Sequence, residues 1–264
     1  MTELKKEFKL VSKKNPKSLL PNALTIFGVC LGLGSIKFAL DLNYPMAVIS
    51  IGIAAILDTL DGRVARLIKG TSSVGKELDS LTDVISFGVA PSFIMYFWAI
   101  NEVGRFGWVF VLIYTVCCAL RLARFNLTSY EEETSWKINF FEGVPSPAAA
   151  GLILLPLISS LSGLVEIQNK EIVSSIFIIA TSALMISKIP TYSLKRIVIP
   201  RNVTVFLLLG FGIYISFLIF YTFQTLMFSG LTYLIIIPIS YFHYRKKSNK
   251  FLKPKDEIED EDVL

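Results

Sequence analysis

Four aspartates stand between residues 58 and 83, within stretches whose composition is otherwise typical of membrane-spanning helices. Asp58 and Asp61 lie near the end of one apolar run, and Asp79 and Asp83 lie near the start of the next. An ionised group at the centre of a bilayer costs about 2.5–3.5 kcal/mol even on the gentler insertion scales. Four such carboxylates therefore require a compensating partner.

The spacing of these aspartates indicates what that partner is. Asp58 and Asp61 share one helical face, and the four-residue step from Asp79 to Asp83 keeps both side chains on one face of the next helix. If the two faces pack together, four carboxylates meet at one point. Carboxylate oxygens without His or Cys suit a hard ion. We therefore predict that Asp58, Asp61, Asp79 and Asp83 bind one or two Mg²⁺ or Mn²⁺ ions, with coordination sites left over for a diphosphate.

Small residues border the carboxylates on both predicted helices. Gly62 directly follows Asp61, and Gly75 precedes Asp79 by about one helical turn. Because glycine has no side chain, both positions let a nucleotide approach the backbone closely. Solvated charges at helix ends are the ordinary alternative for a lone aspartate. Four aspartates at regular spacing beside such small residues favour a buried ion site instead.

These residues form the pattern D-x-x-D-G-x-x-A-R, eight residues, G-x-x-x-D-x-x-x-D, which runs from Asp58 to Asp83. The pattern resembles, at all eight defining positions, the signature of the CDP-alcohol phosphotransferases, integral membrane enzymes that make phospholipids. The resemblance implies that the polar start of the first helix and the residues around the glycines lie against the bound CDP-lipid. The residues that we expect there are Asn22, Thr25, Gly62, Arg66, Ser72 and Gly75.

A second pair of motifs narrows the resemblance to one branch of that family. R-L-A-R-F-N at 121–126 and F-x-G-x-P-x-P-x-A-A at 141–150 resemble the bacterial and archaeal phosphatidylserine synthases. This branch implies a homodimer that transfers a phosphatidyl group from CDP-diacylglycerol to L-serine, with release of CMP. Asp83 would then accept the proton of the serine hydroxyl. The candidates for binding the serine, chosen by elimination because its carboxylate needs a cation, are Arg121, Arg124 and Lys195, together with Asn126 of the first motif.

Composition indicates the fold class. Of the 264 residues, 53% are hydrophobic, so we expect an all-α polytopic membrane bundle of about eight transmembrane helices. The predicted helices lie at about 21–40, 45–67, 78–101, 107–126, 147–164, 172–187, 203–223 and 226–242. The predicted division is a basic N-terminal segment at 1–20, a six-helix catalytic membrane core at 21–200, two additional transmembrane helices at 201–244 and a charged tail at 245–264.

The basic residues predict the orientation in the membrane. Of the 26 Lys and Arg residues, all but Lys37, Arg105 and Lys170 fall in segments that this arrangement places on one side. By the positive-inside rule, that side is the cytoplasm, so both termini and the carboxylate site face it across the cell membrane. The same rule gives the ordinary alternative to serine binding for Arg121 and Arg124: their side chains extend to the membrane surface from a helix end.

Two other functions stay open at this point. The carboxylate signature is shared across the family, so the acceptor alcohol can instead be glycerol 3-phosphate, inositol phosphate or choline. Buried carboxylates also occur in ion and proton transporters. Against transport, the carboxylates cluster at one membrane face and no inverted repeat is evident. Histidine-based catalysis is excluded, because His243 is the only histidine and stands at a helix end.

Overall fold

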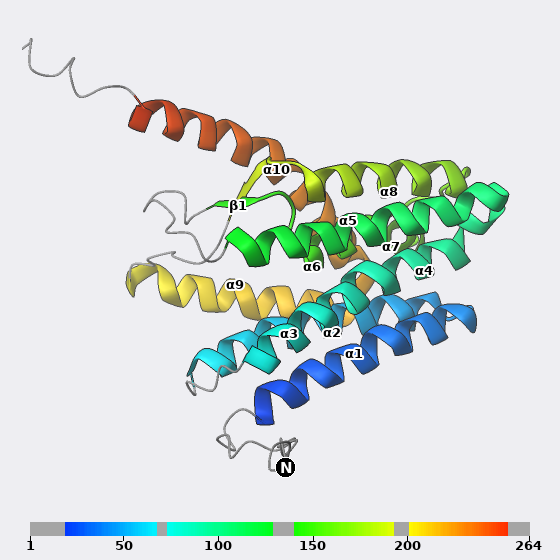
Figure 1. Cartoon of the computed structure of the whole chain (residues 1–264), viewed down its shortest axis with the longest axis horizontal. Coiled ribbons are helices and arrows are strands. Elements are labelled where there is room, and N and C mark those ends of the chain that lie inside the picture. Colours follow the sequence, from blue (N-terminus) through cyan, green and yellow to red (C-terminus); the bar gives the residue numbers. More distant parts are fainter. Residues whose placement is uncertain (1–18, 68–72, 129–139, 193–200, 253–264) are drawn as a thin grey trace, which may run out of the picture.

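The computed structural model describes residues 19–67, 73–128, 140–192 and 201–252 (Figure 1). The first half of the described chain consists of α1 (Leu19–Leu40), α2 (Tyr44–Leu67), α3 (Ser73–Asp83), a π-helix (Val84–Val89), α4 (Ala90–Trp98), a 3₁₀ helix (Ile100–Phe106) and α5 (Gly107–Thr128). The second half consists of β1 (Phe140–Glu142), α6 (Ser146–Ile153), α7 (Leu155–Leu161), α8 (Lys170–Ile186), β2 (Pro190–Tyr192), α9 (Arg201–Phe220) and α10 (Thr222–Leu252). Most of the basic N-terminal segment and the acidic end of the tail, at 1–18 and 253–264, lie outside the described residues.

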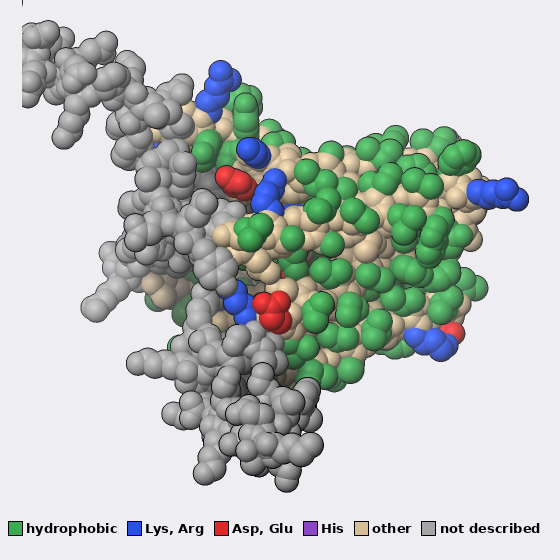
Figure 2. Space-filling view, viewed as in Figure 1, with side chains coloured by type: hydrophobic (Ala, Val, Ile, Leu, Met, Phe, Trp, Pro, Cys, Tyr) green, Lys and Arg blue, Asp and Glu red, His purple; other side chains and the backbone are tan. Residues whose placement is uncertain are grey.

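The all-α membrane fold is confirmed. Within the part of the chain that the structure describes, six helices are long and apolar enough to cross a membrane, at residues 20–40, 44–64, 75–98, 100–127, 203–220 and 222–247. Figure 2 shows the corresponding surface: hydrophobic side chains cover the flank of the bundle, and charged side chains gather toward its two ends. The start of α1, the end of α2, the start of α3 and the end of α10 lie toward the same end of the bundle (Figure 1). The predicted number of eight spanning helices stays a prediction.

The predicted fifth and sixth helices fall short of full spans for identifiable reasons. The fifth is divided into α6 and α7 at Leu154, and Pro156 stands in the first turn of α7. Proline lacks the amide hydrogen for the helical ladder and its ring crowds the preceding turn, so a helix interrupts there. The sixth, α8, is regular but has only 17 residues.

The predicted third helix is not one regular helix. After Asp83, the last residue of α3, the chain widens into the π-helix before α4 begins. Pro91 in the first turn of α4 has no amide hydrogen to give to a preceding carbonyl. Tyr114 on α5 instead donates its hydroxyl to the Phe87 carbonyl oxygen at 3.1 Å. A partner on the neighbouring helix therefore supports the backbone where the ladder is disturbed.

The π-helix packs closely against α1. A Cβ on Gly32 would lie 2.6 Å from Ser86 Oγ and 2.9 Å from Ser86 Cα, so only glycine permits this approach. Ser86 Oγ also donates to the Gly28 carbonyl oxygen at 3.2 Å. Since Ser86 is three residues after Asp83, this contact fixes the end of α3 relative to α1.

A short antiparallel strand pair, absent from the sequence prediction, joins two connections that are distant in the sequence. Phe141 of β1 pairs with Thr191 of β2, and Gly143 directly after β1 donates its backbone N–H to the Ile189 carbonyl oxygen at 2.9 Å. Gly143 has φ +75°, and a Cβ there would lie 2.7 Å from the Met185 carbonyl oxygen. The glycine is therefore required for the strand pair to fold back onto the end of α8.

Candidate metal and substrate site

Three of the four aspartates converge at the end of the bundle where α2 ends and α3 begins. Asp58 and Asp61 on α2 and Asp79 on α3 each offer a carboxylate oxygen, and these oxygens all lie within 4.8 Å of one another. Asp61 is only 4% exposed, and the other two are partly buried. An all-oxygen set of this kind fits a hard divalent cation, and it offers no nitrogen or sulfur ligand. The cluster can therefore hold a metal ion.

A hydroxyl on α1 orients the most buried of these carboxylates. Thr25 Oγ1 lies 2.8 Å from Asp61 Oδ2 and donates to it, and the same hydroxyl lies 3.0 Å from the Pro21 carbonyl oxygen. Thr25 is 5% exposed. The hydroxyl is thus a partner of a candidate metal ligand, a contact that the sequence did not predict. Contact between Thr25 and the CDP-lipid stays a prediction.

Asp83 lies beside the three-carboxylate cluster, on its inner side. Its carboxylate is within hydrogen-bonding reach of Asp58, and Arg121 on α5 interacts electrostatically with both. Asp83 Oδ1 is fully buried and has no hydrogen-bond partner among the described residues. Two carboxylates this close repel each other unless a cation or a proton lies between them. Asp83 is therefore placed to share a cation or a proton with Asp58.

The Arg121 guanidinium is buried and interacts electrostatically with Asp83. Arg121 is 7% exposed, and its Nη1 donates to Ser146 Oγ on α6 at 2.7 Å. Its Nε, also buried, has no hydrogen-bond partner among the described residues. The guanidinium carbon lies 5.5 Å from the centre of the Phe125 ring. A cation held in this way can neutralise Asp83 and still offer a donor to an anionic substrate group.

The other predicted serine contacts join helices to one another. Arg124 donates Nη1 to the Ile186 carbonyl oxygen at 2.8 Å and Nη2 to the Ser187 carbonyl oxygen at 3.3 Å, so it caps the C-terminal end of α8. Asn126 Nδ2 donates to Ser80 Oγ on α3 at 3.0 Å. Lys195 lies outside the described residues. Serine binding by these three side chains stays a prediction.

The predicted CDP-lipid contacts are described only in part. Gly62 is partly buried, and a Cβ there would meet no atom within 4 Å, which leaves open space beside Asp61. Gly75 lies in the first turn of α3, and Asn22 is partly buried near the start of α1. Ser72 and the side chain of Arg66 lie outside the described residues. The open space beside Gly62 is consistent with a close approach by a ligand.

Sequence reasoning missed Ser146 as a partner of Arg121 and Thr25 as a partner of Asp61. Ser146 stands between two prolines in the 141–150 motif and gives no chemical signal of its own. Its contact with Arg121 spans 25 residues of sequence, so helical periodicity cannot indicate it. The only available signal was that both residues belong to the motifs of the same branch.

Comparisons with known proteins show the family of the chain. The family model described as CDP-alcohol phosphatidyltransferase matches residues 18–209. The CDP-diacylglycerol–serine O-phosphatidyltransferase of Mycobacterium leprae is 35% identical over 228 residues, which cover 86% of this chain and 76% of that protein. The enzyme of the same name from Helicobacter pylori strain 26695 is 40% identical over 184 residues, covering 69% and 76%. The one from Mycobacterium bovis is 38% identical over 189 residues, covering 70% of this chain and 64% of that protein.

The matched region contains every helix that contributes to the aspartate cluster, as well as α5 with Arg121. The family model and the curated relatives thus point to the same group of transferases. The chain belongs to the CDP-alcohol phosphatidyltransferase family.

Proposed function

We propose that the chain transfers the phosphatidyl group of CDP-diacylglycerol to L-serine, which forms phosphatidylserine and releases CMP. The observation that carries the proposal is the three-carboxylate cluster of Asp58, Asp61 and Asp79, together with a buried arginine, Arg121, that interacts electrostatically with Asp83. The acceptor follows from the relatives, which are named as serine O-phosphatidyltransferases at 35–40% identity. Every member of the family needs the aspartate carboxylates. An enzyme whose acceptor alcohol itself carries a carboxylate also needs a cationic side chain to bind it.

The cluster of Asp58, Asp61 and Asp79, joined by Asp83, would hold two Mg²⁺ or Mn²⁺ ions. These ions would neutralise the diphosphate and polarise the phosphorus under attack. The hydrogen bond from Thr25 would hold Asp61 in place as a ligand, and the open space at Gly62 would leave room for the nucleotide. Removal of metal with EDTA should abolish CMP release, and Mg²⁺ or Mn²⁺ should restore it.

The remaining steps fall to two side chains. Arg121 binds the serine carboxylate, which orients the serine hydroxyl toward Asp83. Asp83 accepts the hydroxyl proton as the serine oxygen forms its bond to the diacylglycerol-bearing phosphorus, and the bond from that phosphorus to the CMP oxygen breaks. CMP leaves with the electron pair of that bond. Because Asp83 Oδ1 has no protein partner among the described residues, it is available for this proton.

An acceptor screen tests the proposed function. The purified protein is incubated with CDP-diacylglycerol, Mn²⁺ and one alcohol at a time, and released CMP is measured. L-serine should support turnover, whereas glycerol 3-phosphate, inositol phosphate and choline should not. Turnover with another alcohol in place of serine would keep the chemistry and overturn the acceptor. Absence of CMP release with all four alcohols would favour the transporter alternative.

Three further features belong to the same proposal. The site and both termini face the cytoplasm, with the chain in the cell membrane, which the uneven distribution of Lys and Arg supports. Residues 21–200 form the catalytic core and 201–244 add two spanning helices. The protein is a homodimer, as the family resemblance implies. Its mass in detergent, measured by light scattering with the detergent contribution subtracted, should be twice that of one chain.

A further inference from the structure

Two contacts set the register of α5 against the helices that precede it. Toward the carboxylate end of the bundle, Asn126 Nδ2 on α5 donates to Ser80 Oγ on α3 at 3.0 Å. Further inside, a Cβ on Gly88 of the π-helix would lie 3.2 Å from Cys118 Sγ on α5, so the two backbones approach closely there. Residue numbers rise along one helix while they fall along the other, so the two segments run antiparallel.

Asp83 and Arg121 both lie between these two contacts. Asp83 is three residues after Ser80, and Arg121 is three residues after Cys118. Because a helix rises about 1.5 Å per residue, this register brings the two residues to within about 3 Å of the same level along the bundle. Arg121 is buried. The arginine therefore stands inside the bundle at the level of Asp83.

The orientation of the Arg121 guanidinium depends on one contact. Among the described residues, its hydrogen bond is the one from Nη1 to Ser146 Oγ at 2.7 Å, and Ser146 is fully buried. The buried Nε has no hydrogen-bond partner in the same part of the chain. A guanidinium is planar and its donors keep a fixed arrangement, so a hydrogen bond at Nη1 restrains where Nε points. Ser146 thus controls the direction in which the unpartnered donor is presented.

Ser146 is itself held in place through the backbone that precedes it. Gly143 donates its N–H to the Ile189 carbonyl oxygen at 2.9 Å, and Val144 donates its N–H to the Leu184 carbonyl oxygen at 3.3 Å. Ser146 follows two residues after Val144 as the first residue of α6. The hydroxyl is therefore carried by a segment that is bound to the C-terminal end of α8.

The end of α8 is bound in turn to α5. Arg124, about one helical turn after Arg121, donates Nη1 to the Ile186 carbonyl oxygen at 2.8 Å and Nη2 to the Ser187 carbonyl oxygen at 3.3 Å. These hydrogen bonds form a closed ring, which runs from Arg124 to the end of α8, then to the segment before α6, and from Ser146 back to Arg121. A connected network of buried hydrogen bonds rigidifies the groups that it joins.

We propose that Ser146 is a positioning residue that holds Arg121 so that its Nε meets the carboxylate of the acceptor substrate. The proposal rests on the proposed function, in which Arg121 binds the serine carboxylate. Arg124 acts in the same ring, through the end of α8, and not by contact with the substrate. A guanidinium that is poorly oriented keeps its charge but loses the geometry of a charge-assisted hydrogen bond, so the effect falls on acceptor binding.

The test is Ser146→Ala, which removes the hydroxyl that orients Arg121. KM for L-serine should rise about tenfold, the change expected for loss of one hydrogen bond to a charged group. KM for CDP-diacylglycerol and kcat at saturating serine should stay close to wild type, because the metal cluster is unchanged. Ser146→Thr keeps a hydroxyl and should keep KM for serine close to wild type. An unchanged KM for serine in Ser146→Ala, or equal rises in KM for serine and for CDP-diacylglycerol, would overturn the positioning role.

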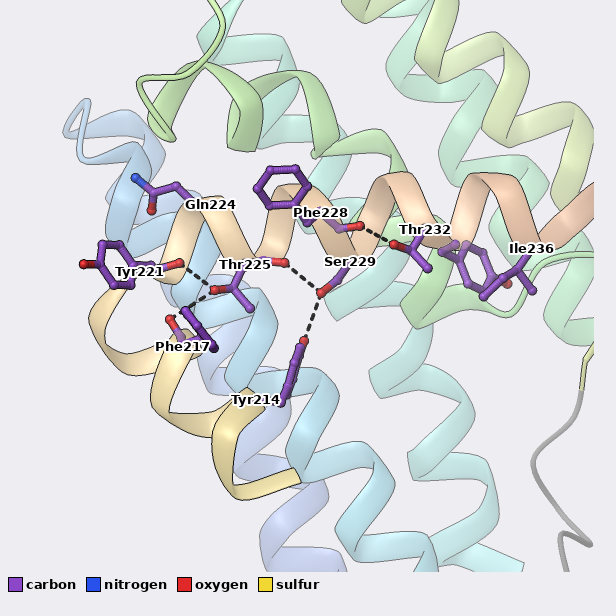
Figure 3. A pocket seen from close by; sticks show the side chains of 10 residues that line it. Tyr214, Phe217, Tyr221, Gln224, Thr225, Phe228, Ser229, Thr232 and Ile236 are labelled. Atoms are coloured by element: carbon purple, nitrogen blue, oxygen red, sulfur yellow. Dashed lines mark hydrogen bonds between the residues drawn. The ribbon is translucent and has the colours of Figure 1, made fainter. Parts of the chain in front are cut away.

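Ser229→Ala is the matched control for the loss of a serine hydroxyl. Ser229 Oγ donates to the Thr225 carbonyl oxygen at 2.7 Å and lies 3.1 Å from the Tyr214 hydroxyl across the groove between α9 and α10 (Figure 3). This hydroxyl belongs to no part of the ring, so its loss should leave KM for serine unchanged. A rise in KM for serine equal to that of Ser146→Ala would also contradict the proposal.

A double substitution tests the ring. Arg124→Gln should also raise KM for serine, and Arg124→Lys, which can still donate to the carbonyls at the end of α8, should raise it less. If Arg124 acts through Ser146, the double variant Arg124→Gln/Ser146→Ala should have a KM for serine within about twofold of the higher single variant. Rises that multiply would show that Arg124 acts outside the ring and would overturn that part of the proposal. The failure of the proposed function is distinguishable, because in that case the wild-type protein itself releases no CMP with serine.

Discussion

A substitution of Thr25 tests the metal site, because Thr25 contacts the candidate metal ligand Asp61 and is not itself a candidate ligand. Its hydroxyl lies 2.8 Å from Asp61 Oδ2, and both side chains are at least 95% buried, so no solvent replaces the contact. Valine keeps the shape of threonine and removes the hydroxyl. A hydrogen bond to a charged group contributes about 1.5–3 kcal/mol, or roughly 10–100-fold in an equilibrium constant. Loss of a residue that orients a metal ligand typically weakens metal binding by a similar factor, about 10–100-fold.

The assay follows CMP release at saturating CDP-diacylglycerol and serine while Mn²⁺ is added back to EDTA-treated protein. Thr25→Val should shift the half-maximal Mn²⁺ concentration upward about 10–100-fold, with most of kcat recovered at high metal. Thr25→Ser keeps the hydroxyl and should titrate nearly as wild type. A wild-type Mn²⁺ curve for Thr25→Val would refute the reasoning. If the curve stays in place and KM for CDP-diacylglycerol rises instead, Thr25 contacts the nucleotide rather than orienting Asp61.

Three further predictions concern the base, the strand pair and the topology. Asp83→Asn should lower kcat about 10²–10⁴-fold while calorimetry still detects CDP-diacylglycerol binding, and turnover at the wild-type rate would mean that Asp83 is no base. Gly143→Ala should lower Tm, because an alanine at φ +75° costs about 1–2 kcal/mol in backbone strain, and its Cβ would also crowd the Met185 carbonyl oxygen. The control Gly151→Ala should leave Tm unchanged, because a Cβ at Gly151 meets no atom within 4 Å. Equal Tm values of the two variants would contradict this account. In a cysteine-free background, Lys76→Cys should react with an impermeant maleimide only from the cytoplasmic side and Lys170→Cys only from the other, and the reverse pattern would invert the topology.

The convergence of the carboxylates was predictable because it depends on local geometry. Asp58 and Asp61 are three residues apart, so helical periodicity places both on one face of α2. Asp79 follows on the next helix, α3. In a membrane, charged side chains turn toward the interior of the bundle, which decides how the two helices face each other. The prediction therefore needed no knowledge of the rest of the chain.

The contact of Arg121 with Ser146 was not predictable in this way. The two residues meet across 25 residues of sequence, and no short spacing encodes the contact. Pro91 was the one sequence signal for the π-helix after Asp83. A proline indicates that the backbone hydrogen bonds of a helix are interrupted, but it does not indicate that a hydroxyl from another helix, that of Tyr114, donates to the free carbonyl.

Hydrogen bonding within the bilayer adds a separate argument for where the substrate binds. Backbone carbonyls that the π-helix leaves exposed are satisfied by Tyr114 and Thr115 from α5, as a membrane interior requires. Five buried side-chain atoms among the described residues have no such partner, and three of them are hydroxyls of Ser174, Ser182 and Ser240. A neutral hydroxyl left alone costs little compared with a charged group.

The other two unpartnered atoms, Asp83 Oδ1 and Arg121 Nε, belong to charged side chains. These two side chains interact electrostatically with each other. One is an acceptor and the other a donor, in a region where a buried charge is tolerated only when paired and hydrogen-bonded. Serine carries a matching hydroxyl donor and carboxylate acceptor on adjacent carbons. Under the proposed function, the serine hydroxyl would reach Asp83 and the serine carboxylate would reach Arg121, whereas choline has no anionic group to offer to the arginine.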